Sequence, residues 1–482
     1  MKNINKLLLP ALAASLFTGC QSGTKQKANT EKNPNIVFIL ADDYGWKDIG
    51  YNGEGFYETP NIDKLAADGM IFTNNYAAGP NCAPSRACLM SGMYTPRHHL
   101  YTPGGKSKGN IEYMKLKVPT RKADASYNTF QSNFDEIDPK ITSVAEVIKQ
   151  GGYTTARFGK WHIGEDTQGF DVSSSNGLSM GLEEKHYGDI NVADQLTDAG
   201  IKFIDSNKEK PFFLYISHWD VHTPIRAKVE VEARFKEKLK QQGGNWNPTY
   251  AAMIAAVDES VGNIRAKLQE LGLEENTLFV FTSDNGGQPH ITSNKPLKGG
   301  KGSLFEGGIR VPACMYWPGT IKPGNSCDVP IIGVDFLPTF AELAGAPLPK
   351  DQPVDGESIV PLLHGEKNLK RESIFWHFPL YLKGSKGNKV LPISGTNQLY
   401  WRGTPSSAIR KGDWKLIYYF EDQSVKLFNV VQDIGEENDL SQANLEKAAE
   451  LLKELKAWQK ETNAPVPSEL NPVFDYIGQK KK

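Results

Sequence analysis

The sequence contains few cysteines and almost no net charge. Five cysteines occur among 482 residues, and none falls in a Cys-x-x-Cys pair or a Cys/His zinc spacing. So few cysteines exclude a disulfide-dense scaffold, and the missing spacings remove the usual zinc motifs. The formal net charge is -1, so no overall field would attract nucleic acid or an acidic membrane surface. We therefore expect no nucleic-acid partner, and any bound anion must be held by a local cluster.

The start of the chain also lacks a hydrophobic run long enough to span a bilayer. The run there, LLLPALAASLFTG, has 13 residues and follows Lys2 and Lys6, which is typical of a signal peptide. It ends directly at Cys20, an order that resembles a bacterial lipoprotein signal; an ordinary signal peptide with a chance cysteine is the alternative. We predict a signal over residues 1–20 with Cys20 lipidated, then a polar tether over 21–33. The lipid would anchor an exported protein in the periplasm or on the outer-membrane surface.

Helices alternate with apolar strands through most of the chain. The run from Asn35 to Leu40, NIVFIL, is continuously apolar and rich in β-branched residues, as expected of a strand buried on both faces. Further helix–strand units are expected over residues 143–162, 193–220 and 250–287. This order predicts an α/β domain over residues 34–365, with a large, mostly parallel sheet flanked by helices. In such sheets, ligands bind beyond the carboxyl ends of the strands.

The pattern changes after about residue 365. Short aromatic runs such as SIFWHFPLY and SSAIRKGDWKLIYYF predict an antiparallel sheet. A helical pattern follows them, with Ser441 as its expected N-cap. We therefore predict a smaller C-terminal domain over residues 366–482. The polar stretch 101–138 is expected to be a long loop region near the site.

Acidic and amide side chains follow two of the expected strands. Asp42 and Asp43 come after the first strand, and Asp284 and Asn285 come after TLFVFTS. Paired carboxylates repel one another unless a cation lies between them, and hard oxygen ligands suit calcium or magnesium. The alternative is that Asp42 caps a helix and the Asp-Asn pair makes a turn.

Basic and imidazole side chains follow other expected strands in three clusters. Taken singly, such a lysine is usually solvated and such a histidine is usually structural. Three clusters near strand ends together favour an anion-binding pocket. The clusters are Lys160 with His162, His218 with His222, and Lys298 with Lys301 in a glycine-rich loop.

The segment NCAPSRACLMSG places a cysteine at the expected start of a helix. Pro84 suits a first helical turn, so Cys82 would lie at the N-terminal end, where free amides and the helix dipole favour an anion. Arg86 follows four residues later, on the same face. A buried structural cysteine and a thiolate nucleophile are the alternatives, but neither accounts for Pro84 and Arg86 together.

The stretch CAPSR matches the C-x-P-S-R signature of the type I, formylglycine-dependent sulfatases. Other blocks resemble the same arylsulfatase-like family in its own order, from about residue 34 to 345. They are PNIVFILADDYGW, TPNIDKLAADG, GKWHIG, HTP, TSDNGG, GGKGSLFEGGIRVP and DFLPTFAELAG. The sequence as a whole is similar to those of the sulfatases that bacteria use on polysaccharides. The resemblance implies an alkaline-phosphatase-like fold and hydrolysis of a sulfuric ester.

The resemblance further implies how residue 82 acts. A sulfatase-maturating enzyme would oxidise Cys82 to formylglycine, whose hydrated form carries two hydroxyls. One hydroxyl would attack the sulfur and displace the alcohol, and the second would release the sulfate and regenerate the aldehyde. A calcium ion would polarise the sulfate.

The family's motifs also imply a role for each matching residue. The implied calcium ligands are Asp42, Asp43, Asp284 and Asn285, together with residue 82. Arg86 and Lys160 would orient the formylglycine and neutralise sulfate oxygens, and His162 would take the proton from the second hydroxyl. His222 and Lys301 would bind the sulfate and assist the leaving alcohol. Lys298 matches no family residue, and His218 is expected in the pocket wall.

The substrate is expected to be a sulfated carbohydrate, with an O-sulfate on a galactose-type sugar that includes N-acetylgalactosamine. Candidate residues for the outer subsites are His98, His377, Trp401 and Arg402, for each of which packing is the alternative. One rival function keeps the fold but hydrolyses phosphonate or phosphodiester bonds. Another is a non-catalytic glycan-binding lipoprotein, which the intact set of motif residues argues against.

Overall fold

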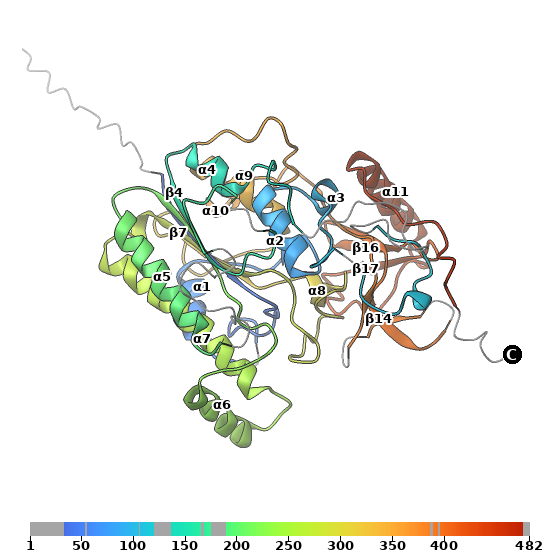
Figure 1. Cartoon of the computed structure of the whole chain (residues 1–482), viewed down its shortest axis with the longest axis horizontal. Helices are drawn as coiled ribbons and strands as arrows, with labels where there is room; N and C mark the ends of the chain where they lie inside the picture. Colours follow the sequence, from blue (N-terminus) through green and yellow to red (C-terminus); the bar gives the residue numbers. More distant parts are fainter. Residues whose placement is uncertain are drawn as a thin grey trace, which may run out of the picture. The chain divides into compact units, whose positions relative to one another are not determined.

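An eight-stranded, mostly parallel sheet lies at the centre of the fold in the computed structural model of the chain (Figure 1). Strand β1 runs parallel to β6 on one side and to β7 on the other, and β8 pairs with β7 in the antiparallel sense. The strands, in spatial order, are β5 (Val172–Ser173), β4 (Thr154–Gly159), β6 (Phe212–Ser217), β1 (Asn35–Ala41), β7 (Thr277–Ser283), β8 (Ala313–Tyr316), β2 (Met70–Phe72) and β9 (Asn325–Cys327).

The structure describes residues 33–475, apart from residues 54, 106, 120–135, 165–167, 175–188, 386–388 and 394–395. The predicted signal peptide, Cys20 and nearly all of the tether lie outside the described residues, as does part of the expected loop 101–138. Within the described part, no helix combines the length and the apolar character needed to cross a membrane.

Both faces of the central strand are buried, as its sequence predicts. Alternate side chains of β1 enter different cores: Phe38 belongs to one and Ile39 to the other. Because side chains along a strand point to opposite faces, a continuous apolar run is what a strand covered on both sides requires.

Helices cover the two faces of the sheet (Figure 1). On one face lie α1 (Pro60–Asp68), α5 (Val192–Asn207) and α7 (Pro248–Glu270), with α6 (Val229–Gln242) packed against α7. On the other face lie α2 (Cys82–Ser91), α4 (Val144–Lys149), α9 (Phe336–Leu343) and α10 (Val360–Leu363). The predicted α/β architecture, with a large and mostly parallel sheet flanked by helices, is therefore confirmed.

The C-terminal region contains two small antiparallel sheets and one long helix. They pack in a third core that also takes residues before residue 120, such as Tyr101. One sheet contains β11 (Ser373–Phe378), β15 (Ser406–Lys411), β16 (Trp414–Tyr419) and β17 (Val425–Asn429); the other contains β12 (Leu382–Lys383), β14 (Leu399–Gly403) and β13 (Leu391–Pro392). The predicted antiparallel sheet and helix are confirmed.

The long C-terminal helix begins later than its sequence suggests. Helix α11 spans Leu445–Glu461 and has Asn444 at its N-cap. Ser441 instead lies in the turn before the helix, so its assignment as the N-cap was wrong. The expected boundary at residue 365 falls shortly before β11, and residues from Asn33 onward form one compact unit across it.

Candidate active site

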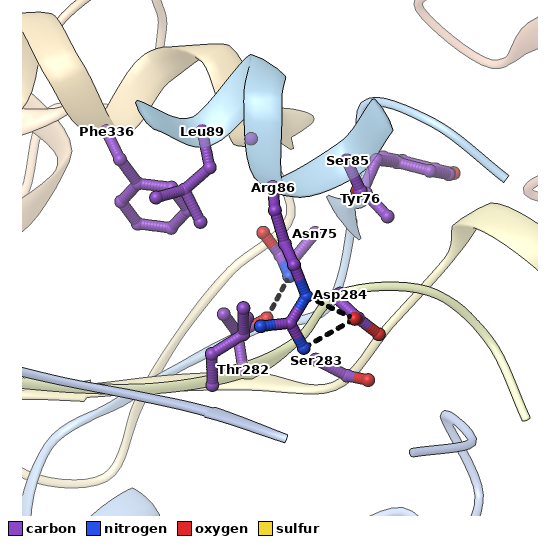
Figure 2. A pocket seen from close by; sticks show the side chains of 12 residues that line it. Asn75, Tyr76, Ser85, Arg86, Leu89, Thr282, Ser283, Asp284 and Phe336 are labelled. Atoms are coloured by element: carbon purple, nitrogen blue, oxygen red, sulfur yellow. Dashed lines mark hydrogen bonds and ion pairs between the residues drawn. The ribbon is translucent and has the colours of Figure 1, made fainter. Parts of the chain in front are cut away.

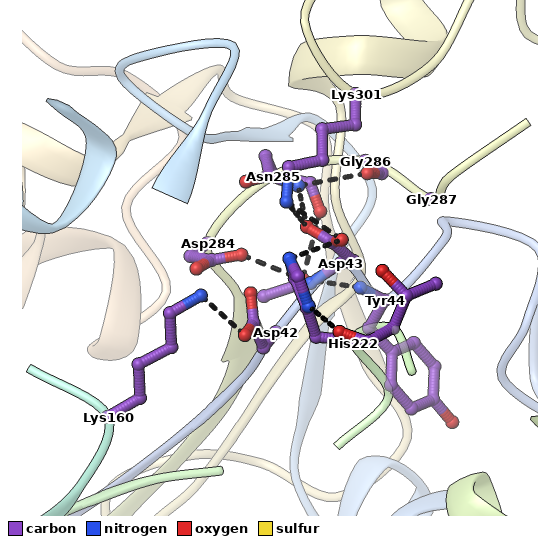
Figure 3. A network of polar contacts seen from close by, with 12 residues as sticks. Asp42, Asp43, Tyr44, Lys160, His222, Asp284, Asn285, Gly286, Gly287 and Lys301 are labelled. Atoms are coloured by element: carbon purple, nitrogen blue, oxygen red, sulfur yellow. Dashed lines mark hydrogen bonds and ion pairs between the residues drawn. The ribbon is translucent and has the colours of Figure 1, made fainter. Parts of the chain in front are cut away.

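The polar groups of the site gather at the carboxyl ends of four neighbouring strands, β4, β6, β1 and β7 (Figure 3). Asp42 follows β1, Asp284 follows β7, and Lys160 follows β4 directly. His222 lies in the loop after β6. Because parallel strands end at the same edge of a sheet, residues far apart in the sequence meet here, as the strand-exit pattern predicts.

Three buried ion pairs form the floor of the site. Each carboxylate has its own cation, which offsets the cost of removing the carboxylate charge from water. The pairs are Lys160 Nζ with Asp42 Oδ2 at 2.5 Å, Lys301 Nζ with Asp43 Oδ1 at 2.6 Å, and Arg86 Nη2 with Asp284 Oδ2 at 2.7 Å.

The two aspartates that follow β1 differ in their pKa. Burial alone would raise the pKa of Asp43, but Lys301 and His222 together hold it well below its ordinary value. Burial raises the pKa of Asp42, and Lys160 offsets this only in part, since Asp43 and Cys82 raise it further. An additional positive charge beside Asp42 would therefore stabilise its carboxylate.

The residues present fit a hard cation at this position. Asp42 Oδ1 and Asn285 Oδ1 are buried and have no hydrogen-bond partner among the described residues. The amide of Asn285 donates its Nδ2–H to Asp43 Oδ1 at 2.7 Å, which leaves Oδ1 as the free acceptor. Ligand atoms of Asp42, Cys82 and Asp284 lie within 4.8 Å of one another. Buried orphan oxygens of this kind are ligands that calcium prefers.

Cys82 is the first residue of α2, a helix in which every residue is buried. Asn81 before it is extended, and Pro84 lies in the first turn, where its missing N–H costs no helical hydrogen bond. Burial opposes ionisation of the Cys82 thiol, but Lys160 and Lys301 outweigh burial and lower its pKa. The position therefore favours a negatively charged group.

Arg86 is a positioning residue. Its side chain is fully buried, and it donates to Asp284 Oδ2, to the Lys160 carbonyl and to Ser217 Oγ. It lines a small cavity between α2 and β7 (Figure 2). The cavity has a volume of about 10 Å³, roughly the space that one water needs. The guanidinium is thus fixed between the strand end and the helix that carries Cys82, and it holds Asp284 in place.

Two histidines of the site are neutral. Burial, with Lys160 and Arg86 nearby, lowers the pKa of His162 to about 3, and burial lowers that of His222 to about 4. His222 Nδ1 lies 2.5 Å from the Thr223 carbonyl, which makes Nδ1 the donor and directs Nε2 towards Asp43 Oδ2 at 3.6 Å. His162 can therefore accept a proton, and the ring of His222 is oriented by its own backbone.

Two of the site residues adopt backbone angles that are rare outside glycine. Asp43 has φ of 62° and His162 has φ of 65°. Left-handed conformations cost free energy at residues with a side chain, and they are concentrated at functional sites. No sequence pattern indicated them.

Three of the four residues predicted to contact the outer part of the substrate do not do so. His98 and His377 are buried, and so is Trp401, whose exposed fraction is 0%. His98 Nε2 lies 3.3 Å from Cys88 Sγ, and His377 Nδ1 bonds Ser407 Oγ at 2.7 Å. For these three residues the alternative, packing in the protein interior, is the one that the structure shows.

Other predicted positions are placed as follows. His218 is fully buried, as are the residues of the site floor, and Lys298 points away, donating to the Glu436 carbonyl at 3.0 Å. Arg402 lies partly buried beside Lys301. His290 was not predicted: it lies in the loop before the glycine-rich segment, and burial, with Arg402 and Lys301, lowers its pKa. A lone histidine in a loop forms no pattern that would have indicated it.

Comparison with known proteins identifies the family. The family model described as "Sulfatase" matches residues 34–346, and the model "N-sulphoglucosamine sulphohydrolase, C-terminal" matches residues 300–463. A sulfatase of Formosa agariphila is 31% identical, with 96% of this chain and 95% of that protein covered. An N-acetylgalactosamine-6-O-sulfatase of Bacteroides thetaiotaomicron is 28% identical, with 94% and 98% covered.

A solved structure agrees with these relatives. The crystal structure of Ps i-CgsB in complex with k-i-k-neocarrahexaose superposes with a TM-score of 0.68 at 29% identity, and 93% of this chain and 96% of that chain are covered. The fold is therefore the alkaline-phosphatase-like fold that the resemblance implied. With the family model covering more than half of the sequence, the chain belongs to the sulfatase family and is a sulfuric ester hydrolase.

Proposed function

We propose that this sulfatase depends on calcium and on formylglycine at residue 82, and that it removes a sulfate ester from a galactose-type sugar, including N-acetylgalactosamine, in a glycan. Relatives named as N-acetylgalactosamine-6-sulfatases, from mouse and from Bacteroides thetaiotaomicron, support the sugar. They also make the 6-O-sulfate the first position to test.

One observation carries the proposal. The residue at position 82 lies at a buried helix start, within 4.8 Å of oxygens of Asp42 and Asp284, and Lys160 and Lys301 lower its pKa against the effect of burial. The same atoms thus offer a cation site and a nucleophile position in one place.

Calcium and formylglycine would each supply one part of the chemistry. A calcium ion held by Asp42, Asp43, Asp284 and Asn285 would polarise the sulfate ester. Formylglycine would offer a hydrated aldehyde whose hydroxyl attacks sulfur while the bond between sulfur and the sugar oxygen breaks.

The chain's own side chains then bind the sulfate and move protons. Lys160 and Lys301 are positioned to neutralise sulfate oxygens, since both ammonium groups lie within the floor of the site. His162, which is neutral, accepts a proton at the nucleophile. His222 faces the same floor through Nε2 and serves the leaving sugar oxygen, because the charge of a bound sulfate favours its protonated form.

We further propose that the protein is exported as a lipoprotein through Cys20, to the periplasm or the outer-membrane surface, and that a sulfatase-maturating enzyme is its processing partner. The N-terminal sequence pattern supports this. Cell fractionation of the full chain and of Cys20→Ala tests it: the variant should leave the membrane fraction.

The function is tested by sulfate release from position-defined sulfated sugars in the presence of calcium. The panel contains 2-, 3-, 4- and 6-O-sulfated galactose, N-acetylgalactosamine and N-acetylglucosamine and sulfated uronate disaccharides, with Cys82→Ala as the blank. We expect release from a galactose-type sugar and none from the variant. A peptide mass at residue 82 shows whether the cysteine has been converted.

Three outcomes would contradict parts of the proposal. Release only from non-galactose sugars would change the substrate. Faster hydrolysis of phosphonate or phosphodiester substrates than of any sulfate ester would favour that rival reaction. Converted protein that binds glycans without turnover would favour the non-catalytic lipoprotein.

A further inference from the structure

Arg402 is a cation beside the site that has no carboxylate partner among the described residues. Its Nη1 reaches only the Lys301 carbonyl at 3.4 Å, and its Nε has no hydrogen-bond partner in the described part of the chain. Arg86, Lys160 and Lys301, by contrast, each pair with an aspartate on the floor of the site. A half-buried guanidinium with unused donors is costly unless an anion binds it.

The surrounding loops hold this guanidinium next to the reacting position. Gly302 has φ of 90°, and a Cβ added there would lie 2.6 Å from Arg402 Nε, so the glycine provides the space that the arginine occupies. Gly302 also donates its N–H to the Pro80 carbonyl at 2.7 Å, two residues before Cys82. Arg402 on β14 therefore lies against the loop that carries Lys301, near the start of α2.

His290 is an exposed residue of the loop between β7 and the glycine-rich segment. Its Nδ1 is 3.4 Å from Ser385 Oγ. The preceding residue, Pro289, packs against the glycine-rich loop that holds Arg402, because a Cβ added at Gly300 would lie 2.4 Å from Pro289 Cγ. Burial, and then the charge of Arg402, lowers the pKa of His290. His290 also lines a groove of about 470 Å³ whose other walls include Asn245, Trp246, Asn247 and Pro289. Amide, imidazole and aromatic groups in a groove are typical of a sugar-binding surface.

We propose that Arg402 and His290 form a second anion subsite, which binds a second negatively charged group of the glycan while the sulfate to be removed lies on the floor of the site. The group is a second sulfate or the carboxylate of a neighbouring uronate, because both offer the planar or forked oxygens that a guanidinium binds in a bidentate way. This inference rests on the proposed function. A second anion subsite explains why Arg402 has no carboxylate partner in the described part of the chain, whereas each cation on the floor of the site has one.

The test compares three probes on Arg402→Gln and Arg402→Lys. They are N-acetylgalactosamine 6-sulfate, N-acetylgalactosamine 4,6-disulfate, and a uronate–N-acetylgalactosamine 6-sulfate disaccharide. The matched control is Lys298→Gln, which removes a charge from the same glycine-rich loop, because Lys298 Nζ points away to the Glu436 carbonyl. Sulfate release gives kcat and KM, and the Cys82→Ala protein gives Kd for each probe without turnover.

We expect Arg402→Gln to raise KM about tenfold or more for a probe with a second anion, the effect of losing a charge-assisted hydrogen bond. The monosulfated probe should change less than about threefold, Arg402→Lys should recover part of the loss, and Lys298→Gln should match the wild type. If the disulfated probe shows the loss, the second group that binds Arg402 is a sulfate; if the uronate probe shows it, that group is a carboxylate.

Two results would overturn the inference: an equal loss for all three probes, which would make Arg402 a ligand of the transferred sulfate, or no loss for any. If the wild type releases sulfate from no probe, the proposed function fails separately. The Kd values then decide the inference, which requires tighter binding of a two-anion probe that Arg402→Gln abolishes.

Discussion

His222 is the residue whose role depends most on the substrate's leaving group. A sugar alcohol is a poor leaving group and needs a proton, whereas p-nitrophenolate leaves without one. We therefore expect His222→Gln to lower kcat for a sulfated sugar by about 10²–10⁴-fold and to change kcat for p-nitrophenyl sulfate far less. Steady-state kinetics on both substrates measure the difference.

The exposed and remote His364 supplies the control for this substitution. His364→Gln should leave both substrates at wild-type rates. Equal losses on the two substrates in His222→Gln would instead mean that His222 only binds the sulfate, because a binding role does not depend on the leaving group.

The orphan oxygen of Asp42 predicts a metal effect on stability as well as on activity. A ligand that binds only the folded state stabilises it, by about 2.7 kcal/mol at 100 times its dissociation constant. We expect chelation to lower Tm, calcium to restore it, and Asp42→Asn to abolish most of the calcium-dependent shift. A calcium-dependent Tm in Asp42→Asn that equals that of the wild type would place the cation elsewhere.

Residues that follow the ends of parallel strands could be placed at the site from the sequence. Backbone conformation and the burial of loop residues could not be predicted, because they depend on contacts formed only in the folded protein. Asp42 and Asp284 come directly after apolar strands, so their meeting follows from the geometry of a parallel sheet. The left-handed backbone of Asp43 depends on its contacts after folding. The burial of His98 and His377 could not be predicted either, because the sequence around a histidine does not show whether residues distant in the chain, such as those of the third core, will cover it.

Strand β14 shows how one element can serve both packing and binding. Trp401 and Arg402 are neighbours, so their side chains point to opposite sides of the strand. Trp401 is fully buried between the rings of Tyr381 and Tyr400, while Arg402 faces the glycine-rich loop. An aromatic pattern alone could not distinguish these two faces.

The two faces of β14 should respond differently to substitution. Trp401→Ala should lower the free energy of unfolding by about 3–5 kcal/mol, the usual cost of removing a large buried aromatic side chain. Arg402→Gln should not lower it and should raise it slightly, because this side chain has no ion pair in the described part to lose and its unused donors cost free energy in the folded protein. Urea unfolding of the two variants gives both values, and a small effect at Trp401 would contradict its place in the core.

At the scale of the whole molecule, a buried charge network joins the catalytic loops to the C-terminal sheet. Glu306, at the start of α8 (Glu306–Ile309), pairs with Lys415 of β16 at 2.9 Å and with Arg310 at 2.6 Å. Glu436 pairs with the same lysine at 2.9 Å and accepts the Glu306 backbone N–H at 2.6 Å. Glu306 and Arg310 are four residues apart, so their pair is local. Lys415 lies 109 positions from Glu306, and Glu436 lies 130 positions from it, so the lysine shared by two glutamates could not be predicted from a local sequence pattern.

This network predicts how stability depends on pH. Burial raises the pKa of Glu436 to about 7, with Lys415 opposing the rise and Glu306 adding to it. In the unfolded chain the carboxyl group has its ordinary pKa of 4.5, so between pH 4.5 and 7 only the folded state keeps this proton. The free energy of unfolding therefore falls as pH rises through this range, by on the order of 1 kcal/mol per pH unit. Glu436→Gln, which cannot ionise, should gain stability relative to the wild type over that range and show no further relative gain above about pH 8. Urea unfolding of both proteins at each pH gives the difference in their free energies of unfolding, in which the contributions of other buried acids cancel. If this difference stays constant between pH 5 and 8, Glu436 is ionised throughout and Lys415 fully compensates its charge.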